Sequence, residues 1–207
     1  MDNTGNLGIL TGILLIVFIL IGAVGASVIM NGSGDTSEED YSQMVDEVVD
    51  EISTYVQVKD IIGKYELVQG EYQIHKIAIL MRPLVSIELD TLHMSIEISD
   101  GEQLYLLFPS GQSAFISSYS LFNHPLWENT TEGSFSFLVA IDEDRSMIEY
   151  QVINKNTDTA FLIVNFPAGL SMKYGDTIEL TLLPAPGVER SFTLEAPLPI
   201  DHVVSLY

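Results

Sequence analysis

Residues 7–30 read LGILTGILLIVFILIGAVGASVIM, a stretch without a charged residue in which only Thr11 and Ser27 have polar side chains. At about 1.5 Å of rise per residue, a helix of this length extends roughly 36 Å, which is enough to cross the hydrocarbon core of a bilayer. Such a helix is apolar on every side, and the remainder of a chain of 207 residues cannot cover it by packing. We therefore expect it to lie in lipid or against copies of itself.

Small residues gather toward the end of this stretch, at Gly22, Ala23, Gly25 and Ala26. In membranes, small side chains allow two helices to approach closely and to gain dispersion contacts along their backbones. We predict that these four residues form the helix-to-helix contacts of an assembly. A plain membrane anchor, which needs only length and apolarity, is the alternative interpretation.

The next segment predicts an amphipathic continuation of the helix. After the glycine-rich NGSG, apolar residues recur at spacings of three and four from Tyr41 to Val56, while acidic residues fill the opposite side. This apolar face needs a partner of its own, and a long helix tolerates the glycines at modest cost. We therefore predict one long helix from about residue 7 to about residue 62, and a first domain over residues 1–62.

From Gly63 onward the periodicity changes to two residues, and turn-forming residues recur at short intervals. Short alternating strands separated by such turns are typical of an all-β sandwich. The sequence therefore predicts the α+β class: a long hydrophobic amino-terminal α-helix followed by an immunoglobulin-like antiparallel β-sandwich over residues 63–207. The strands that we predict are 66–68, 72–81, 94–99, 103–108, 135–141, 148–154, 159–166, 177–183, 189–195 and 203–206. The alternation in 75–80 and 94–98 predicts strands with one buried face.

The composition excludes several classes of function. The chain carries eight Lys and Arg against 29 Asp and Glu, a net charge of -21. This balance argues against nucleic acid as a partner, because its phosphates repel carboxylates. Cysteine is absent, which excludes disulfides, thiolate metal sites and thiol nucleophiles.

The titratable residues do not form a catalytic pattern. The four histidines are scattered without the spacing of metal-binding motifs, and no glycine-rich phosphate loop is present. We therefore predict that the chain is not an enzyme and has no cofactor. Asp142 and Asp144 belong to a short acidic cluster that we interpret as a solvated hairpin end. Binding of Ca²⁺ or another divalent cation by these two residues is the alternative, although the glycine and final glutamate of an EF-hand are missing.

Three stretches of the sequence carry motifs, and both the motifs and their order along the chain are informative. They are GILLIVFILIGAVGASVIMNGSG at residues 12–34, YQIHKIAILMRPLVSIELDTLHMSIEISDG at residues 72–101 and LPAPGVERSFTLEAPLPIDHVVSLY at residues 183–207. The first resembles the amino-terminal rod of the archaellins, the filament subunits of the archaeal swimming organelle. The second is similar to their first strands, with an I-x-K-I-x-I-x-V-x-P pattern, and the third to their carboxy-terminal hairpin with a final V-V-x-L. The resemblance covers nearly the whole chain.

The resemblance implies a structural function. An archaellin is a subunit of the archaellum, the extracellular motility filament, and polymerises with copies of itself or related subunits through its amino-terminal helix. The outer β-sandwich would then form the sheath of the filament. Before assembly, the helix would anchor the precursor in the membrane, and an assembly platform protein and an ATPase would supply the work of extraction.

One departure from the family pattern keeps a second interpretation open. Archaellin precursors resemble type IV prepilins in having a short basic leader that a peptidase removes just before the apolar helix. Here the first basic residue is Lys59, so that pattern is not matched. The alternative function is a membrane-anchored accessory or stator protein of the same machinery, or a pilin-like cell-surface protein, with an extracytoplasmic β-sandwich.

Two acceptor sequences for N-glycosylation are present, at Asn31 and Asn129. The resemblance implies that such sites are used, because archaellins are commonly glycosylated on their outer domains. Asn129 follows a loop-like His-Pro-Leu-Trp segment and would be accessible to a transferase. Asn31 adjoins the apolar helix, where a glycan would interfere with helix packing.

Overall fold

The computed structural model describes residues 56–86, 88–116, 120–185 and 187–207. Most of the predicted helix therefore lies outside the described residues. Also outside them are the first acceptor asparagine and the four small residues of the predicted helix contacts, namely Asn31, Gly22, Ala23, Gly25 and Ala26. Within the described ranges, no helix is long and apolar enough to cross a membrane.

The described residues form a β domain with a few short helical segments. The strands are β1 Val56–Val68, β2 Glu71–Pro83, β3 Leu89–Asp90, β4 Ser95–Ser99, β5 Leu104–Phe115, β6 Ser134–Ile141, β7 Val152–Ile153, β8 Thr159–Asn165, β9 Thr177–Leu183, β10 Arg190–Glu195 and β11 Val203–Ser205. The helical segments are η1 Thr91–His93, η2 Leu121–Asn123, α3 Leu126–Asn129 and α4 Ser146–Glu149.

Nine of these strands form one hydrogen-bonded sheet in the order β10-β9-β4-β5-β6-β8-β2-β1-β11, and β3 pairs with β7. Strand β5 joins two halves of this sheet, because its residues 104–107 pair with β4 and its later residues pair with β6. The register shifts between Pro109 and Ser113, where β5 passes from one half to the other.

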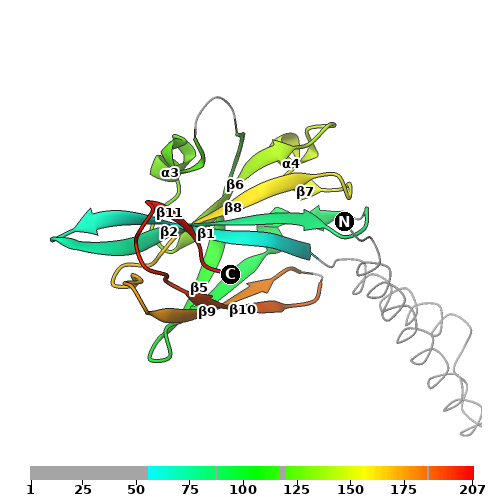
Figure 1. The fold of residues 1–207 in the computed structure, drawn as a ribbon. Helices are drawn as coiled ribbons and strands as arrows, with labels where there is room; N and C mark the ends of the chain where they lie inside the picture. The colour runs from blue at the N-terminus through cyan, green and yellow to red at the C-terminus, as the bar shows by residue number, and fades with distance from the viewer. Residues whose placement is uncertain (1–55, 87, 117–119, 186) are drawn as a thin grey trace, which may run out of the picture. The chain divides into compact units, whose positions relative to one another are not determined.

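One hydrophobic core lies between the two halves. Its fully buried side chains come from β4, β9 and β10 in one half and from β1, β2, β6 and β8 in the other. Figure 1 shows the halves as two layers, with β9 and β10 below β1, β2 and β8. The β-rich part of the predicted fold is therefore confirmed.

The predicted boundary at Gly63 is wrong, because β1 starts at Val56 and pairs with β2 along its whole length. Its register shifts between Val58 and Asp60, which interrupts the alternation of the strand. The buried side chains of Val56 and Ile61 are consequently five residues apart and do not show a two-residue period. The residues just before Gly63 therefore belong to the β domain and not to the predicted helix.

The prediction of a wholly antiparallel sandwich is also wrong, because β5 and β6 are parallel. Phe108 lies opposite Ser134, and Phe115 lies opposite Val139. Parallel neighbours need a crossover connection. Here the connection contains η2 and α3.

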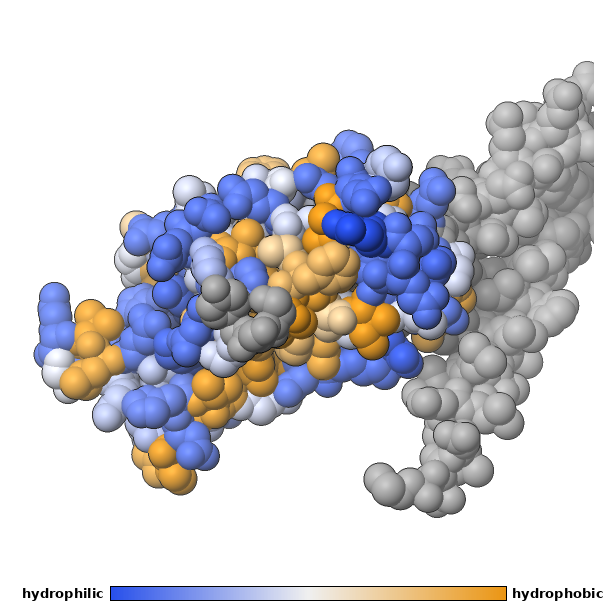
Figure 2. All heavy atoms as spheres, turned by 90° about the horizontal axis from the view of Figure 1, so that it is seen from above, coloured by the Kyte–Doolittle hydropathy of each residue, from blue (hydrophilic) through white to orange (hydrophobic). Residues whose placement is uncertain are grey.

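This connection covers the outer face of the central strands. Its apolar side chains pack with one outward-facing residue from each of β2, β6 and β8 in a second cluster, formed by Phe122, Leu126, Trp127, Ala78, Leu138 and Ile163. Figure 2 looks onto this side of the domain, where hydrophobic residues gather near the middle and hydrophilic residues surround them. The prediction of one buried face therefore holds for β4 but fails for β2, which is covered on both faces.

The predicted strand 148–154 is wrong over most of its length. Its first residues lie in the short helix α4, and only Val152–Ile153 form strand β7. The backbone N–H groups of Ser146 and Met147 donate to the carboxylate of Asp142, at 3.2 and 3.0 Å. A carboxylate that accepts these bonds holds the first turn of α4, which apolar periodicity does not reveal.

The last described residues pair with β1 and pack against it. Strand β11 pairs with it, with Ser205 opposite Ile62, and the buried Leu206 follows. A Cβ atom on Gly63 would lie 3.0 Å from Leu206 Cδ1 and 3.0 Å from Ile74 Cγ2. Glycine at this position therefore allows Leu206 to enter the core.

Candidate functional site

The acceptor asparagine Asn129 is the last residue of α3, and its side chain is exposed. Thr130 is buried, and its Oγ1 donates to the carbonyl oxygen of Leu126 at 2.9 Å. Thr131, the hydroxyl residue that completes the sequon, is exposed. Both ends of the sequon are therefore at the surface, while its middle residue fixes the backbone.

The support beneath Asn129 is a short helix rather than the predicted loop. The ring of Trp127 stacks on Phe122, with centroids 5.5 Å apart and an interplanar angle of 16°. Its Nε1 donates to the carbonyl oxygen of Leu121 at 2.8 Å. Asn165 of β8 donates from Nδ2 to the carbonyl oxygens of Trp127 and of the residue after Asn129. These bonds fix α3 on the sheet, so the acceptor is presented on a rigid surface.

A pocket of about 500 Å³ adjoins this helix. Trp127 and Glu132, which flank the sequon, line it together with Lys76, whose Nζ lies 5.8 Å from the centre of the Trp127 ring. Two further lining residues, His75 and Asn165, each have a buried side-chain atom without a hydrogen-bond partner among the described residues. The sequence did not reveal this pocket, because its walls come from segments far apart along the chain.

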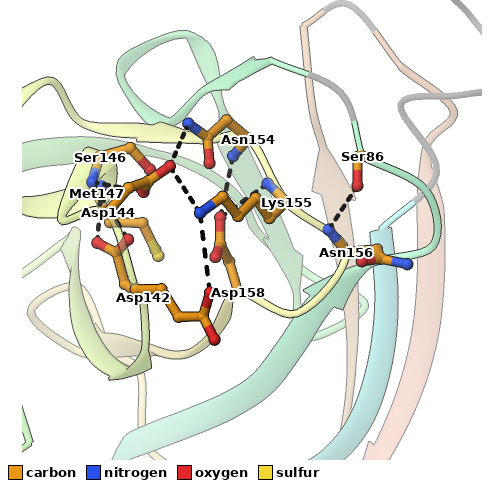
Figure 3. Close-up of polar contacts among 10 residues, drawn as sticks. Ser86, Asp142, Asp144, Ser146, Met147, Asn154, Lys155, Asn156 and Asp158 are labelled. Carbon is orange, nitrogen blue, oxygen red and sulfur yellow. Dashed lines mark hydrogen bonds and ion pairs between the residues drawn. The ribbon is translucent and has the colours of Figure 1, made fainter.

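The acidic cluster lies in the loop between β6 and β7 and contacts the residues that follow β7 (Figure 3). Asp144 accepts a hydrogen bond from Asn154 Nδ2 at 3.0 Å and lies 3.2 Å from Lys155 Nζ. The same ammonium group lies 4.0 Å from Glu143. Asp158, which is buried, accepts bonds from the backbone N–H groups of Asn154 and Lys155 at 3.1 and 2.9 Å. The cluster therefore joins two segments of the chain around one cation, Lys155.

The carboxylates of this cluster have opposite pKa shifts. Burial raises the pKa of Asp142, and the negative charges of Asp158 and Asp144 add to the increase. The hydrogen bond from Asn154 holds the pKa of Asp144 well below its ordinary range, with help from the backbone of Ser146 and from Lys155. The hydrogen bond to Asp144 in turn raises the pKa of Lys155. Asp144 and Lys155 thus form the ion pair of the cluster.

The structure brings the two predicted cation ligands, Asp142 and Asp144, into one loop. Lys155 already supplies positive charge beside Asp144. Across residues 56–86, 88–116, 120–185 and 187–207, no group of three or more His, Asp or Glu side chains is placed to hold a metal ion. The observed geometry stabilises the turn that contains α4.

Comparison with known proteins connects this fold to one family. The sequence profile of the archaeal-type flagellins matches residues 5–194. Flagellin B3 of Methanocaldococcus jannaschii is 30% identical over 173 residues, which cover 79% of this chain and 76% of Flagellin B3.

Two solved structures share the fold. The crystal structure of archaeal flagellin FlaB1 from Methanocaldococcus jannaschii gives a TM-score of 0.61 at 21% identity, covering 73% of this chain and 95% of FlaB1. The archaeal flagellum of Methanospirillum hungatei strain JF1 gives a TM-score of 0.54 at 12% identity, covering 97% of this chain and 99% of that one. From the profile match and the relative at 30% identity, we conclude that the chain belongs to the archaeal-type flagellin family, whose members are structural filament proteins and not enzymes.

Proposed function

We propose that the chain is a structural subunit of the archaeal motility filament and that it polymerises with copies of itself through its amino-terminal helix. The observation that carries this proposal is the family match over residues 5–194, which include the apolar stretch 7–30 and all of the β domain except its last residues. A helix that lipid accepts before assembly, and that many copies bury together afterwards, suits both states of such a subunit.

The subunit moves between two locations in this proposal. Before assembly the apolar helix lies in the membrane, and after assembly the subunit is part of an extracellular filament on the cell surface. Extraction from lipid requires work, which the assembly platform and ATPase implied by the family resemblance supply. With a net charge of -21, packed copies repel one another, so salt that screens carboxylates stabilises the filament.

N-glycosylation at Asn129 is part of the proposal. Its side chain is exposed on a support fixed by Trp127 and Asn165. Mass spectrometry of native peptides that contain Asn129 or Asn31 measures the occupancy of each. We expect a glycan at Asn129 and a lower occupancy at Asn31.

Divalent cation binding at Asp142 and Asp144 is proposed as a secondary property that requires displacement of Lys155 from Asp144. Calorimetric titration with Ca²⁺ of the chain and of its Lys155→Met variant tests this. Tighter binding by the variant supports the site. Equal, undetectable binding by both proteins contradicts it.

The helix-packing role is tested by the Gly22→Leu, Ala26→Leu double variant. Length and apolarity are kept, so membrane insertion should persist, whereas overpacking costs on the order of 1 to 3 kcal/mol at each repeated contact and should block filaments. The measurement is the yield of sedimentable filaments, identified by electron microscopy, beside the membrane-bound pool. Normal filaments from this variant would contradict the packed-helix proposal. A wild-type chain that stays in the membrane and forms no filaments would favour the anchored accessory or stator protein.

Val24→Asp serves as the control variant. A carboxylate in the apolar segment is costly both in lipid and in a packed bundle. We therefore expect this change to reduce the membrane-bound pool and the filaments together.

A further inference from the structure

Strand β5 carries an exposed apolar stripe, which we define as Leu104, Leu106 and Phe108. These side chains are 64%, 53% and 59% exposed, although they are separated by inward-facing residues such as the fully buried Leu107. Contiguous apolar surface of this kind marks an interaction site when polar residues surround it. We therefore expect the apolar stripe to contact another protein surface.

Acidic side chains border the apolar stripe. On β4, Glu97 lies opposite Leu106. On β9, the exposed Glu179 lies opposite Ser99, which in turn lies opposite Leu104. The residues that share this outer face therefore give the stripe a negative border, and a matching surface needs cations beside apolar side chains.

A second surface combines cations with exposed apolar side chains. We define it as the basic pole, which consists of Lys59, Arg82, Leu84 and Val85. Lys59 lies where the register of β1 is shifted, and Arg82 lies opposite Gln57, to which it donates a hydrogen bond at 3.2 Å. Both cations are exposed, as are Leu84 and Val85.

The two cations of the basic pole stand out in a strongly acidic chain. Most of the other cationic side chains form ion pairs with carboxylates, namely Lys64, Lys76, Arg145, Lys155 and Lys173. Within the ranges that the structure describes, Lys59 and Arg82 form no ion pair with a carboxylate, and partial desolvation together with the charge of Arg82 lowers the pKa of Lys59. An acidic surface is the complement that this pair lacks.

The two surfaces lie at opposite ends of the domain. In Figure 1 the turn between β4 and β5 is at the lower left, whereas β1 begins and β2 ends at the right. The two surfaces therefore face away from each other on one molecule. A contact between two copies joins unlike surfaces, and such a heterologous contact extends into a chain of subunits when the rotation does not close.

We propose that the basic pole of one subunit docks on the apolar stripe of a second copy, so that outer domains meet head to tail. This proposal rests on the proposed filament function. Leu84 and Val85 cover the stripe, while Lys59 and Arg82 face Glu97 and Glu179. The outer domains thereby add a directional contact to the packing of the helices.

Chemical crosslinking tests the contact in assembled filaments. Because the chain has no cysteine, engineered thiols are the sole targets of a short bismaleimide. The Leu84→Cys, Leu106→Cys variant places one thiol in each surface, so every subunit links to two neighbours. We expect a ladder of covalent oligomers from this variant and dimers at most from each single variant.

A matched control pairs Leu84→Cys with Tyr150→Cys, since Tyr150 is exposed but lies outside the apolar stripe. A ladder from the control as strong as from the test pair overturns the proposal, and so does a test pair that gives none. If the wild-type chain forms no filaments at all, the proposed function fails and the contact fails with it. Filaments without a specific ladder overturn the contact alone.

Charge reversal provides a second measurement. Lys59→Glu with Arg82→Glu should lower filament yield by about tenfold or more, because four carboxylates then face one another. Adding Glu97→Lys and Glu179→Lys should restore the yield. Arg145→Glu with Lys173→Glu makes the same change in net charge elsewhere and should have a smaller effect. Equal losses from the two reversals, or no rescue, would show that total charge alone governs assembly.

Discussion

The two halves of the sheet differ in what covers them. Strands β2, β6 and β8 have the core on one face and the η2–α3 connection on the other, whereas β4 and β9 have the core on one face only. In β8 the consecutive residues Leu162 to Val164 are fully buried, whereas in β9 the buried Leu180 and Leu182 flank the half-buried Thr181. The covered half therefore supplies rigidity, and the open half leaves a surface for other molecules.

The largest effect should come from a charge in the covered half. Ile163→Asp places a carboxylate between β8 and α3 and should destabilise the domain by about 4 kcal/mol or more. Thr181→Asp on the open face should cost only about 1 kcal/mol, because it loses a hydrogen bond with Ser191 and faces Glu97 across the sheet but stays in contact with solvent. Urea unfolding of residues 56–207, which contain the whole described core, measures both. A helical circular dichroism spectrum of this fragment would contradict the fold itself.

The packing of the η2–α3 connection on the covered half can also be weakened by truncating a single side chain. Trp127→Ala removes the ring that stacks on Phe122 and should cost about 3 kcal/mol. Leu106→Ala in the apolar stripe should leave stability nearly unchanged and reduce filament yield instead. Thermal unfolding beside sedimentation of filaments separates the two outcomes. Equal loss of stability in both variants would show that the halves do not differ as the burial indicates.

A smaller effect is expected where β11 meets the covered half. Gly63→Ala forces a Cβ against Leu206 and Ile74 and should cost about 1 to 2 kcal/mol through overpacking. Leu206→Ala should relieve part of that cost, so the double variant should lose less than the sum of the single ones. Gly70→Ala is the control, because its strain arises from a φ of +89° with no neighbour within 4 Å of the added atom. Strict additivity for the Gly63 pair would contradict the contact.

The smallest effect concerns acid and the loop that contains α4. Because the pKa of Asp144 is lowered in the folded chain, its stabilising contribution is present above the ordinary pKa of about 4 and is lost as pH falls toward the folded value. Asp142 acts in the opposite direction, since its pKa is raised. The backbone amide of Ser146 should therefore lose hydrogen-exchange protection as the pH falls below about 4. In the Asp144→Asn variant this loss should be less steep, because residue 144 then has no carboxylate to protonate. Protection at Thr130, under the cover of α3, should not follow this change.

Much of the open half could be predicted from the sequence. The alternation of Ile178, Leu180 and Leu182 with polar residues identified β9, because one face of that strand meets solvent. Where a bulge interrupts the alternation, as at Lys59 in β1, the same reasoning assigned strand residues to a helix. Local periodicity therefore identifies strands only where their register is regular.

Long-range juxtaposition accounts for the remaining differences. The parallel pairing of β5 and β6 depends on a crossover whose direction no local pattern specifies. Asn129 was identified by its motif, but its rigid support depends on Asn165, which is distant in sequence. Lys59 and Arg82 likewise become neighbours only through the pairing of β1 with β2. Such sites require the fold before they can be recognised.

The position of β11 has a consequence for the order of folding. Ser205 pairs with Ile62, so one edge of β1 lacks its partner until nearly the whole domain has been synthesised. An unpaired edge can associate with other chains, and pairing across such a separation is slow because loop closure must precede it. We therefore expect the domain to complete its folding after translation, at a rate set by this last pairing. A nascent subunit would then need either a chaperone or rapid export to protect the open strand.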